Sequence, residues 1–132
     1  MQIKISTSKK NELVDITDKI NAKIAESEVK KGLCNVYLLH ATAGIVINEN
    51  HDPNVCTDFL NAFRNAIPEH NNYLHDKVDN NAAAHIKAAI IGPSETIPIE
   101  DARLKLGTWQ SVMVADFDGP RQRTIQVTII KD

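Results

Sequence analysis

The chain has 132 residues, 42% of them hydrophobic and 24% charged, which is typical of one globular domain spanning residues 1–132. Its formal net charge of −2 excludes the strongly basic surface that sequence-independent nucleic-acid binding requires. We see no apolar run of membrane-spanning length and no signal peptide, so we expect a cytoplasmic protein that binds neither nucleic acid nor membrane. Cys34 and Cys56 lack metal or redox spacing and are expected to be reduced thiols.

The first part of the chain predicts short strands and one helix. Met1–Ser6 alternates apolar and polar residues as a strand does, and Leu13–Ile16 is a second strand that can pair with it. From Thr17 the apolar residues recur every four positions, which predicts a helix that ends before Gly32.

The stretch HATAGIVINEN, residues 40–50, joins two apolar runs. Leu33–Leu39 predicts a buried strand, and His40 continues one face of it. Small residues then turn the chain, and Ile45–Asn48 predicts the next strand, most simply as a hairpin. A histidine before the turn and polar residues after the second run suggest either a polar hairpin turn or one wall of a site.

The remainder predicts two helices followed by strands. Asp52-Pro53 is a helix start, because aspartate caps free N–H groups and proline suits the first turn. The buried stripe of that helix is expected to be Val55, Phe59, Phe63 and Ile67. After a polar loop at 69–81 comes an alanine-rich helix, Ala82–Ile91. Further strands are expected at Thr96–Ile99, Leu104–Leu106, Trp109–Phe117 and Gln122–Ile130. This order favours an α+β fold, a largely antiparallel β-sheet sandwich with two or three helices packed on it.

Three of the five histidines are candidates for a site. His40 ends a strand, His75 lies in the polar loop near Asp79, and His85 lies among the alanines of the second helix. Imidazoles from separate elements can form an open metal site, although no compact metal motif is present. The alternative is that these are scattered surface or core histidines.

Other polar and aromatic residues have two interpretations each. Glu49 can orient a histidine, ligate a metal or act as a general base, or it can merely support the turn. Arg121 and Arg123 point the same way on a strand, which suits a phosphate or carboxylate, or else they are solvated strand-end charges. Trp109 is expected in the core, the alternative being a stacking surface for a planar substrate.

Several stretches together resemble the YjbQ family, small proteins also known as secondary thiamine-phosphate synthases. The motifs are HATAGIVINENHDPNV, the YLH of residues 73–75, AAAHIKAAIIGPSETIPI and RLKLGTWQSVMVADFDGPRQRTIQVTII. The resemblance covers roughly residues 33–130. It implies a β-rich α+β fold and a homotrimer with sites near subunit boundaries.

The resemblance also implies a polar cluster built from the histidines and closed by the N-E-N element and the arginines. Combined with the residue chemistry, it leads to one set of expected roles. These are metal ligands His40, His75 and His85, catalytic Glu49 and Asp79, and substrate contacts Asn50, Asn80, Trp109, Arg121 and Arg123. The expected cofactor is a divalent metal, zinc or magnesium. The expected ligand is a small phosphorylated or anionic molecule.

The sequence departs from the family pattern at three places. Ala41-Thr42-Ala43 replaces Thr-Ser-Ala, and Asp79-Asn80-Asn81 carries fewer carboxylates, which weakens a second or harder cation site. Gln122 separates the closing arginines. Three hypotheses therefore stand: an enzyme that joins a pyrimidine diphosphate to a thiazole phosphate, another metal-dependent enzyme such as a hydrolase, and a non-enzymatic trimer that binds an anion or metal.

Overall fold

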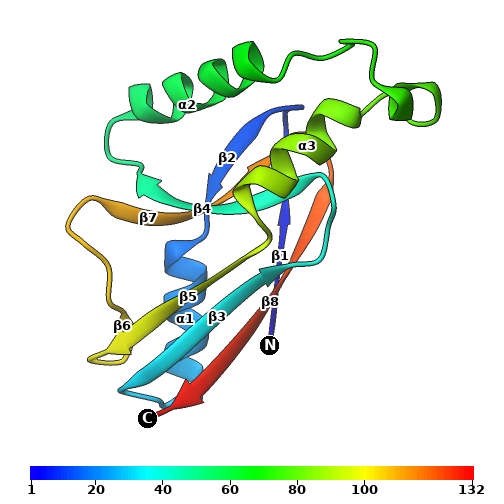
Figure 1. The fold of residues 1–132 in the computed structure, drawn as a ribbon. Coiled ribbons are helices and arrows are strands. Elements are labelled where there is room, and N and C mark those ends of the chain that lie inside the picture. The colour runs from blue at the N-terminus through cyan, green and yellow to red at the C-terminus, as the bar shows by residue number, and fades with distance from the viewer.

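A computed structural model describes residues 1–132 and contains two antiparallel sheets with three α-helices (Figure 1). The first half holds β1 (Gln2–Ser6), β2 (Glu12–Asp15), α1 (Thr17–Ser27), β3 (Gly32–Leu38), β4 (Ala43–Glu49) and α2 (Pro53–Ala66). The second half holds the 3₁₀ turn η1 (Leu74–Lys77), α3 (Ala82–Ile91), β5 (Ser94–Glu100), β6 (Arg103–Leu104), β7 (Gln110–Asp116) and β8 (Gln122–Lys131). The expected α+β fold with an antiparallel sandwich is confirmed.

The two strand pairs predicted from the sequence, β1 with β2 and β3 with β4, are each divided between the two sheets. The five-stranded sheet has the order β1-β8-β3-β5-β6, and the three-stranded sheet has the order β2-β7-β4. The predicted hairpin of β3 and β4 is therefore wrong, and so is the pairing of β1 with β2. Each of these strands pairs instead with a distant partner: β1 and β3 with β8, and β2 and β4 with β7.

The chain changes sheets at the turn between β3 and β4 because the end of α3 packs against it. Gly44 lies so close to α3 that an added Cβ would be 2.7 Å from Cγ2 of Ile91 and 2.9 Å from the carbonyl oxygen of Gly92. The N–H of Ile45 donates to that same carbonyl, and the N–H of Leu38 donates to Pro93. The α3–β5 junction therefore takes the hydrogen bonds that a local hairpin would have used.

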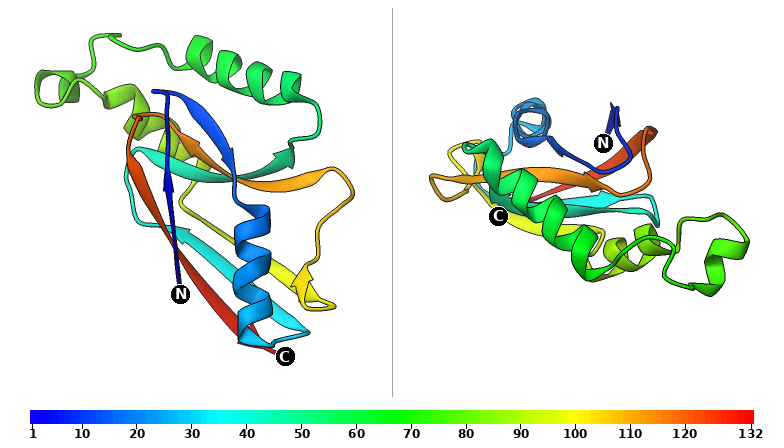
Figure 2. Two further views of the ribbon diagram at one scale, coloured as in Figure 1. Left: turned by 180° about the vertical axis from the view of Figure 1, so that it is seen from behind. Right: turned by 90° about the horizontal axis from the view of Figure 1, so that it is seen from above.

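The main core lies between the inner faces of the sheets and α1, which lies across the five-stranded sheet (Figure 2). Ile16, Ile20 and Ile24 of the α1 region are fully buried, as their spacing predicts. A second, smaller cluster joins α3 to β7 through Ala84, Ala88, Ala115 and Phe117. The small alanines let α3 approach β4 and β7 closely.

The helix α2 begins as predicted, with the Asp52 side chain accepting a hydrogen bond from the N–H of Asn54 at 2.9 Å. Its apolar stripe is only half-buried, so the prediction of a buried stripe is wrong. The helix lies along one margin of the three-stranded sheet, as Figure 1 shows, and the sheet therefore covers it on one side only. None of the helices combines the length and apolar composition that a membrane crossing requires.

Candidate functional site

An open pocket of about 600 Å³ lies at the end of β3, beside the start of β8 and the first turn of α3. Its polar lining includes His40, Thr42, Asp79, Asn81, His85 and Arg121. These residues come from three stretches of the chain, residues 40–42, residues 79–85 and Arg121, and we call the cavity the histidine pocket. It contains two of the three predicted histidines, and the third lies against it.

His40 is fixed by the neighbouring strand. Its Nε2 accepts a hydrogen bond from the backbone N–H of Thr124 at 2.8 Å, so the neutral ring carries its proton on Nδ1. Burial, followed by the positive charge of Arg123, lowers the pKa of His40, with Asp116 acting in the opposite direction. His40 is therefore a neutral hydrogen-bond donor at pH 7.

His75 and His85 form a pair beside the pocket. Their ring centroids are 4.8 Å apart in an edge-to-face arrangement. Nε2 of His75 lies 3.7 Å from Oδ2 of Asp79, one turn further along the chain. The carboxylate can hold the His75 ring in place, and the His85 ring makes no hydrogen bond with the protein. His85 is thus free to exchange a proton with a ligand.

Asn81, Asp118 and Arg121 form a second wall of the pocket, joined by hydrogen bonds. Nδ2 of Asn81 donates to Oδ2 of Asp118 at 2.9 Å, and Arg121 donates to the same oxygen at 3.0 Å and to the Asp118 carbonyl at 2.8 Å. Oδ1 of Asn81 is buried and has no hydrogen-bond partner. The reverse orientation would place that oxygen against the carboxylate, so the free atom is an acceptor. The wall therefore offers an exposed guanidinium and a buried acceptor.

Arg123 lies beneath the pocket and is only 2% exposed. Its guanidinium forms a two-pronged ion pair with Asp116, which is fully buried, and donates to Oγ1 of Thr42 at 2.9 Å. Burial alone would raise the pKa of Asp116, but hydrogen bonds from Arg123, the Asp118 backbone and Thr7 hold it below its ordinary value. Arg123 is thus engaged with the protein, which leaves Arg121 as the accessible cation of the expected pair.

The residues that follow β4 are not brought to the histidine pocket. Glu49 ends β4 and pairs in register with Gln110, while His40 precedes its start, so the two lie about 20 Å or more apart along the strand. Asn50 donates to Asp15 at 2.9 Å. Trp109 is 57% exposed, so the expectation that it lies in the core is wrong. Its ring packs against His51 at 5.0 Å between centroids.

Asn80 also lies outside the histidine pocket. It adopts a left-handed backbone with φ of 56°, which asparagine tolerates better than most residues. It lines a narrow neighbouring cavity together with His70 and Asp76. Asp79, directly before it, does line the histidine pocket.

The donors of one chain do not form a ready-made metal centre. No group of three histidine, cysteine, aspartate or glutamate side chains is arranged to hold a metal ion. The Nε2 lone pair of His40 is already used by Thr124, so ligation there requires that hydrogen bond to break. The proposed ligand set of His40, His75 and His85 therefore does not fit a metal as it stands.

Other residues of the site carry no clear sequence signal. Thr42, Asn81 and Asp118 read as turn residues, and Asp116 ends an apolar strand where a buried carboxylate is rare. The motif DFDGPR could have drawn attention to this wall only through its two closely spaced carboxylates and its arginine.

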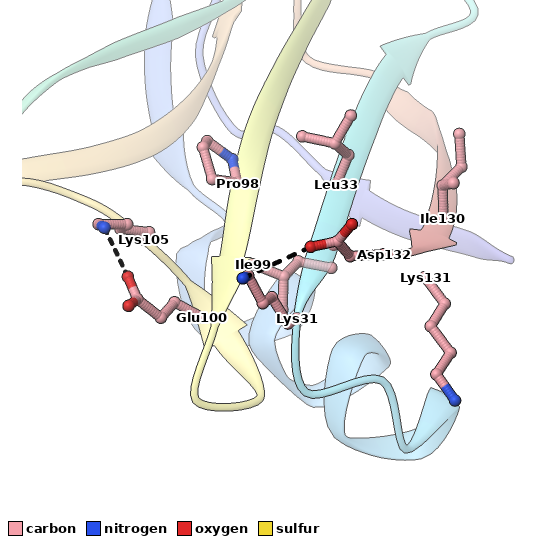
Figure 3. Close-up of a pocket in the computed structure, with 10 residues that line it drawn as sticks. Lys31, Leu33, Pro98, Ile99, Glu100, Lys105, Ile130, Lys131 and Asp132 are labelled. Atoms are coloured by element: carbon pink, nitrogen blue, oxygen red, sulfur yellow. Dashed lines mark ion pairs between the residues drawn. The ribbon is translucent and has the colours of Figure 1, made fainter.

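A second open pocket of about 560 Å³ lies where β3 begins and where β5 and β8 end (Figure 3). Its floor is apolar, with Leu33, Pro98 and Ile130. Four of its five charged side chains pair with each other, Lys31 with Asp132 at 3.6 Å and Lys105 with Glu100 at 2.6 Å, and Lys131 is in no ion pair. It contains none of the expected site residues, so the histidine pocket is the candidate site.

The protein is thus an antiparallel α+β sandwich with a histidine pocket at the end of β3, where the chain passes from one sheet to the other. The chain belongs to the YjbQ family, because the sequence model of the family described as "UPF0047 protein YjbQ-like" matches residues 1–132. A UPF0047 protein of Methanocaldococcus jannaschii is 48% identical over 97% of this chain and 91% of its own length. YugU, a UPF0047 protein of Bacillus subtilis, is 40% identical over 97% of this chain and 96% of its own length.

Solved structures agree with this assignment. A YbjQ-like protein from Sulfolobus solfataricus superposes with a TM-score of 0.95 and 34% identity, covering 100% of this chain and 96% of that one. A YjbQ/UPF0047 family protein from Clostridium acetobutylicum superposes with a TM-score of 0.94 and 42% identity, covering 98% of this chain and 99% of that one. The resemblance seen in the sequence motifs is therefore confirmed, and the fold with it.

Proposed function

We propose that the histidine pocket is an active site for a small phosphorylated heteroaromatic molecule. The observation that carries this proposal is that one cavity brings together a fixed donor, Nδ1–H of His40, and polar groups that can accept, the Asp79 carboxylate and the Asn81 amide. An aminopyrimidine presents the complementary set, a ring nitrogen that accepts and an amino group that donates. Arg121, on the same wall, suits the phosphate groups.

The reaction we propose is thiamine-phosphate formation. The bond between the pyrimidine methylene carbon and the diphosphate oxygen breaks, and its electron pair leaves with pyrophosphate. The thiazole nitrogen then forms the new bond to that carbon. Arg121 stabilises the negative charge that develops on the leaving group, and His85 supplies a proton to it. Asp79 and His75 hold the His85 ring in position.

The test is turnover by purified protein given the pyrimidine diphosphate and the thiazole phosphate, with thiamine phosphate measured by oxidation to fluorescent thiochrome phosphate. His85→Gln should lower kcat by about 100-fold or more, and Arg121→Gln should lower kcat/KM. His70→Asn is the matched control, because His70 lies outside the histidine pocket and asparagine suits its φ of 55°. No turnover by wild type, or equal loss in the control, would contradict the proposal.

The same variants separate the rival functions. Hydrolysis of a phosphate ester that is lost in His85→Gln, without thiamine phosphate, would favour a hydrolase in which Asp79 or His85 activates water. Ligand binding without turnover would favour an anion-binding module.

A metal requirement is tested by elemental mass spectrometry of untagged wild type and His85→Ala. Stoichiometric zinc or another metal that is lost in the variant would require a rearranged ligand set around His75 and His85. No metal after reconstitution would agree with the donor geometry of the single chain.

We further propose that the protein is a homotrimer in which neighbouring subunits cover the histidine pocket. Large apolar side chains are exposed around it: Leu39 by 49%, Leu74 by 81% and Val78 by 74%. Leu74 and Val78 flank His75 in sequence, so a second copy is a reasonable cover for them. The number three comes from the family resemblance.

A trimer can also explain the distant position of Glu49, Asn50 and Trp109, if the neighbouring subunit contributes them. Mixing inactive His85→Gln and Glu49→Gln subunits, followed by dissociation and reassembly, would then restore part of the activity. No restoration, with both variants still trimeric by light scattering, would show that each subunit uses its own residues. Leu74→Asp should weaken the trimer itself.

A further inference from the structure

A third cavity, of about 540 Å³, is lined by residues from the C-terminal end of α2 and from the turn that joins β1 to β2. Figure 1 shows where these two segments lie. The cavity is lined by Lys10, Asn11, Arg64, Asn65, Pro68 and Glu69, and none of these residues lines the histidine pocket. We call it the lysine–arginine pocket. Every lining side chain except proline is polar or charged, so its ligand must be polar as well.

The lining has one internal ion pair. Nζ of Lys10 lies 3.1 Å from Oε1 of Glu69. Arg64 belongs to none of the ion pairs of the protein. One carboxylate therefore serves two cations at the wall of the cavity.

A third cation lies behind the wall. Lys87 of α3 is only 2% exposed, its ammonium is 5.6 Å from the ring centroid of Phe117, and it too belongs to no ion pair. The charges that act on it are Glu69, Arg64 and Lys10, all of which line the cavity. Burial is the main cause that lowers the pKa of Lys87. A buried ammonium is costly without a counter-charge, and Glu69 is the one acid among the charges that act on Lys87 and among the residues that line the cavity.

We propose that the lysine–arginine pocket binds inorganic phosphate or the phosphate group of a small monoester. The local excess of about two positive charges matches a phosphate dianion better than a singly charged carboxylate. The planar fork of Arg64 binds two phosphate oxygens at once, Lys10 supplies a point charge, and the amides of Asn11 and Asn65 supply neutral donors. Lys87 adds positive potential from behind without touching the anion.

Removal of the negative charge of Glu69 tests the proposal, because it should strengthen phosphate binding. The Glu69 carboxylate lines the cavity and holds Lys10, so it competes with an incoming anion. Glu69→Gln should therefore tighten phosphate binding about tenfold, whereas a purely structural role of the ion pair would leave phosphate affinity unchanged. Arg64→Gln and Lys10→Gln should each weaken binding about tenfold or more.

The experiment titrates full-length wild type and variants with sodium phosphate, then with glycerol phosphate, at constant ionic strength, using amide NMR shifts of Asn11 and Asn65. Arg121→Gln is the matched control, because it alters the histidine pocket only. The expected result is binding that survives Arg121→Gln, is lost in Arg64→Gln and is gained in Glu69→Gln. Binding that follows Arg121 alone, weaker binding in Glu69→Gln, or no shift with either ligand would overturn the proposal.

Discussion

Arg123→Gln should strongly destabilise the fold while leaving the surface unchanged. The substitution removes the guanidinium that makes two contacts to Asp116, including Nε to Oδ2 at 3.1 Å. Asp116 is 0% exposed and would keep only Oγ1 of Thr7 at 2.7 Å and the Asp118 N–H at 2.9 Å. Breaking one side of a buried ion pair costs about 3–5 kcal/mol, because the remaining charge is unpaired.

The loss is large relative to the total stability, which for a domain of this length is about 7–20 kcal/mol. The measurement is urea unfolding followed by circular dichroism at pH 7. Arg103→Gln is the matched control, because Arg103 is exposed and forms no ion pair. The double variant Asp116→Asn, Arg123→Gln should recover part of the loss, since it removes the stranded charge.

The pH dependence gives a second check on the same pair. The folded-state pKa of Asp116 lies below its ordinary value of 3.8, so its contribution is complete above that value and fades as the pH falls through the folded pKa. The stability gap between wild type and Arg123→Gln should therefore narrow in acid. A loss of under about 1 kcal/mol at pH 7 in Arg123→Gln would refute the reasoning, because it would place the pair in solvent rather than in the core.

Three further outcomes follow from single groups. Gly119→Ala should cost about 1–3 kcal/mol in urea unfolding, because its Cβ would collide with the carbonyl oxygen of Lys9; a loss of a few tenths would contradict this close approach. Burial lowers the pKa of His40 below its ordinary value of 6.5, so the unfolded chain binds a proton at a higher pH than the folded protein does. The free energy of unfolding in urea should therefore fall as the pH drops below 6.5, and it should fall less in His40→Gln. Burial raises the pKa of the Cys34 thiol to about 11, so in a Cys56→Ser variant at pH 8 it should react with a disulfide reagent only after urea unfolding, and rapid labelling of that folded variant would disprove its burial.

The elements of this protein could be predicted from local patterns, and their pairing could not. The four-residue period of Ile16, Ile20 and Ile24 predicts α1, because a helix turns once in 3.6 residues and buries one face. The Asp52-Pro53 start of α2 is likewise a local effect of capping. Strand partners are different, because backbone hydrogen bonds join β3 to β8 across about 90 residues with no pattern that names the partner.

The candidate site divides in the same way. Residue chemistry and family motifs drew attention to His40, His75 and His85, and the fold does place them in one region. The same motifs linked Glu49 to His40 because they are near in sequence, but β4 carries Glu49 to the far end of the sheet. Arg121 and Arg123 share a spacing of two, yet one guanidinium is exposed and the other is buried against Asp116.

The sequence by itself therefore determined the element types, the α+β class, the family and the identities of the histidines, because these depend on periodicity, capping and residue chemistry. Only the tertiary structure decided which strands pair, that Nε2 of His40 is used by Thr124, that Oδ1 of Asn81 is left free, and that Lys87 is buried beside Lys10 and Arg64. The physical reason is that hydrogen bonding, burial and charge compensation depend on neighbours in space, and most of those neighbours are supplied by distant parts of the chain.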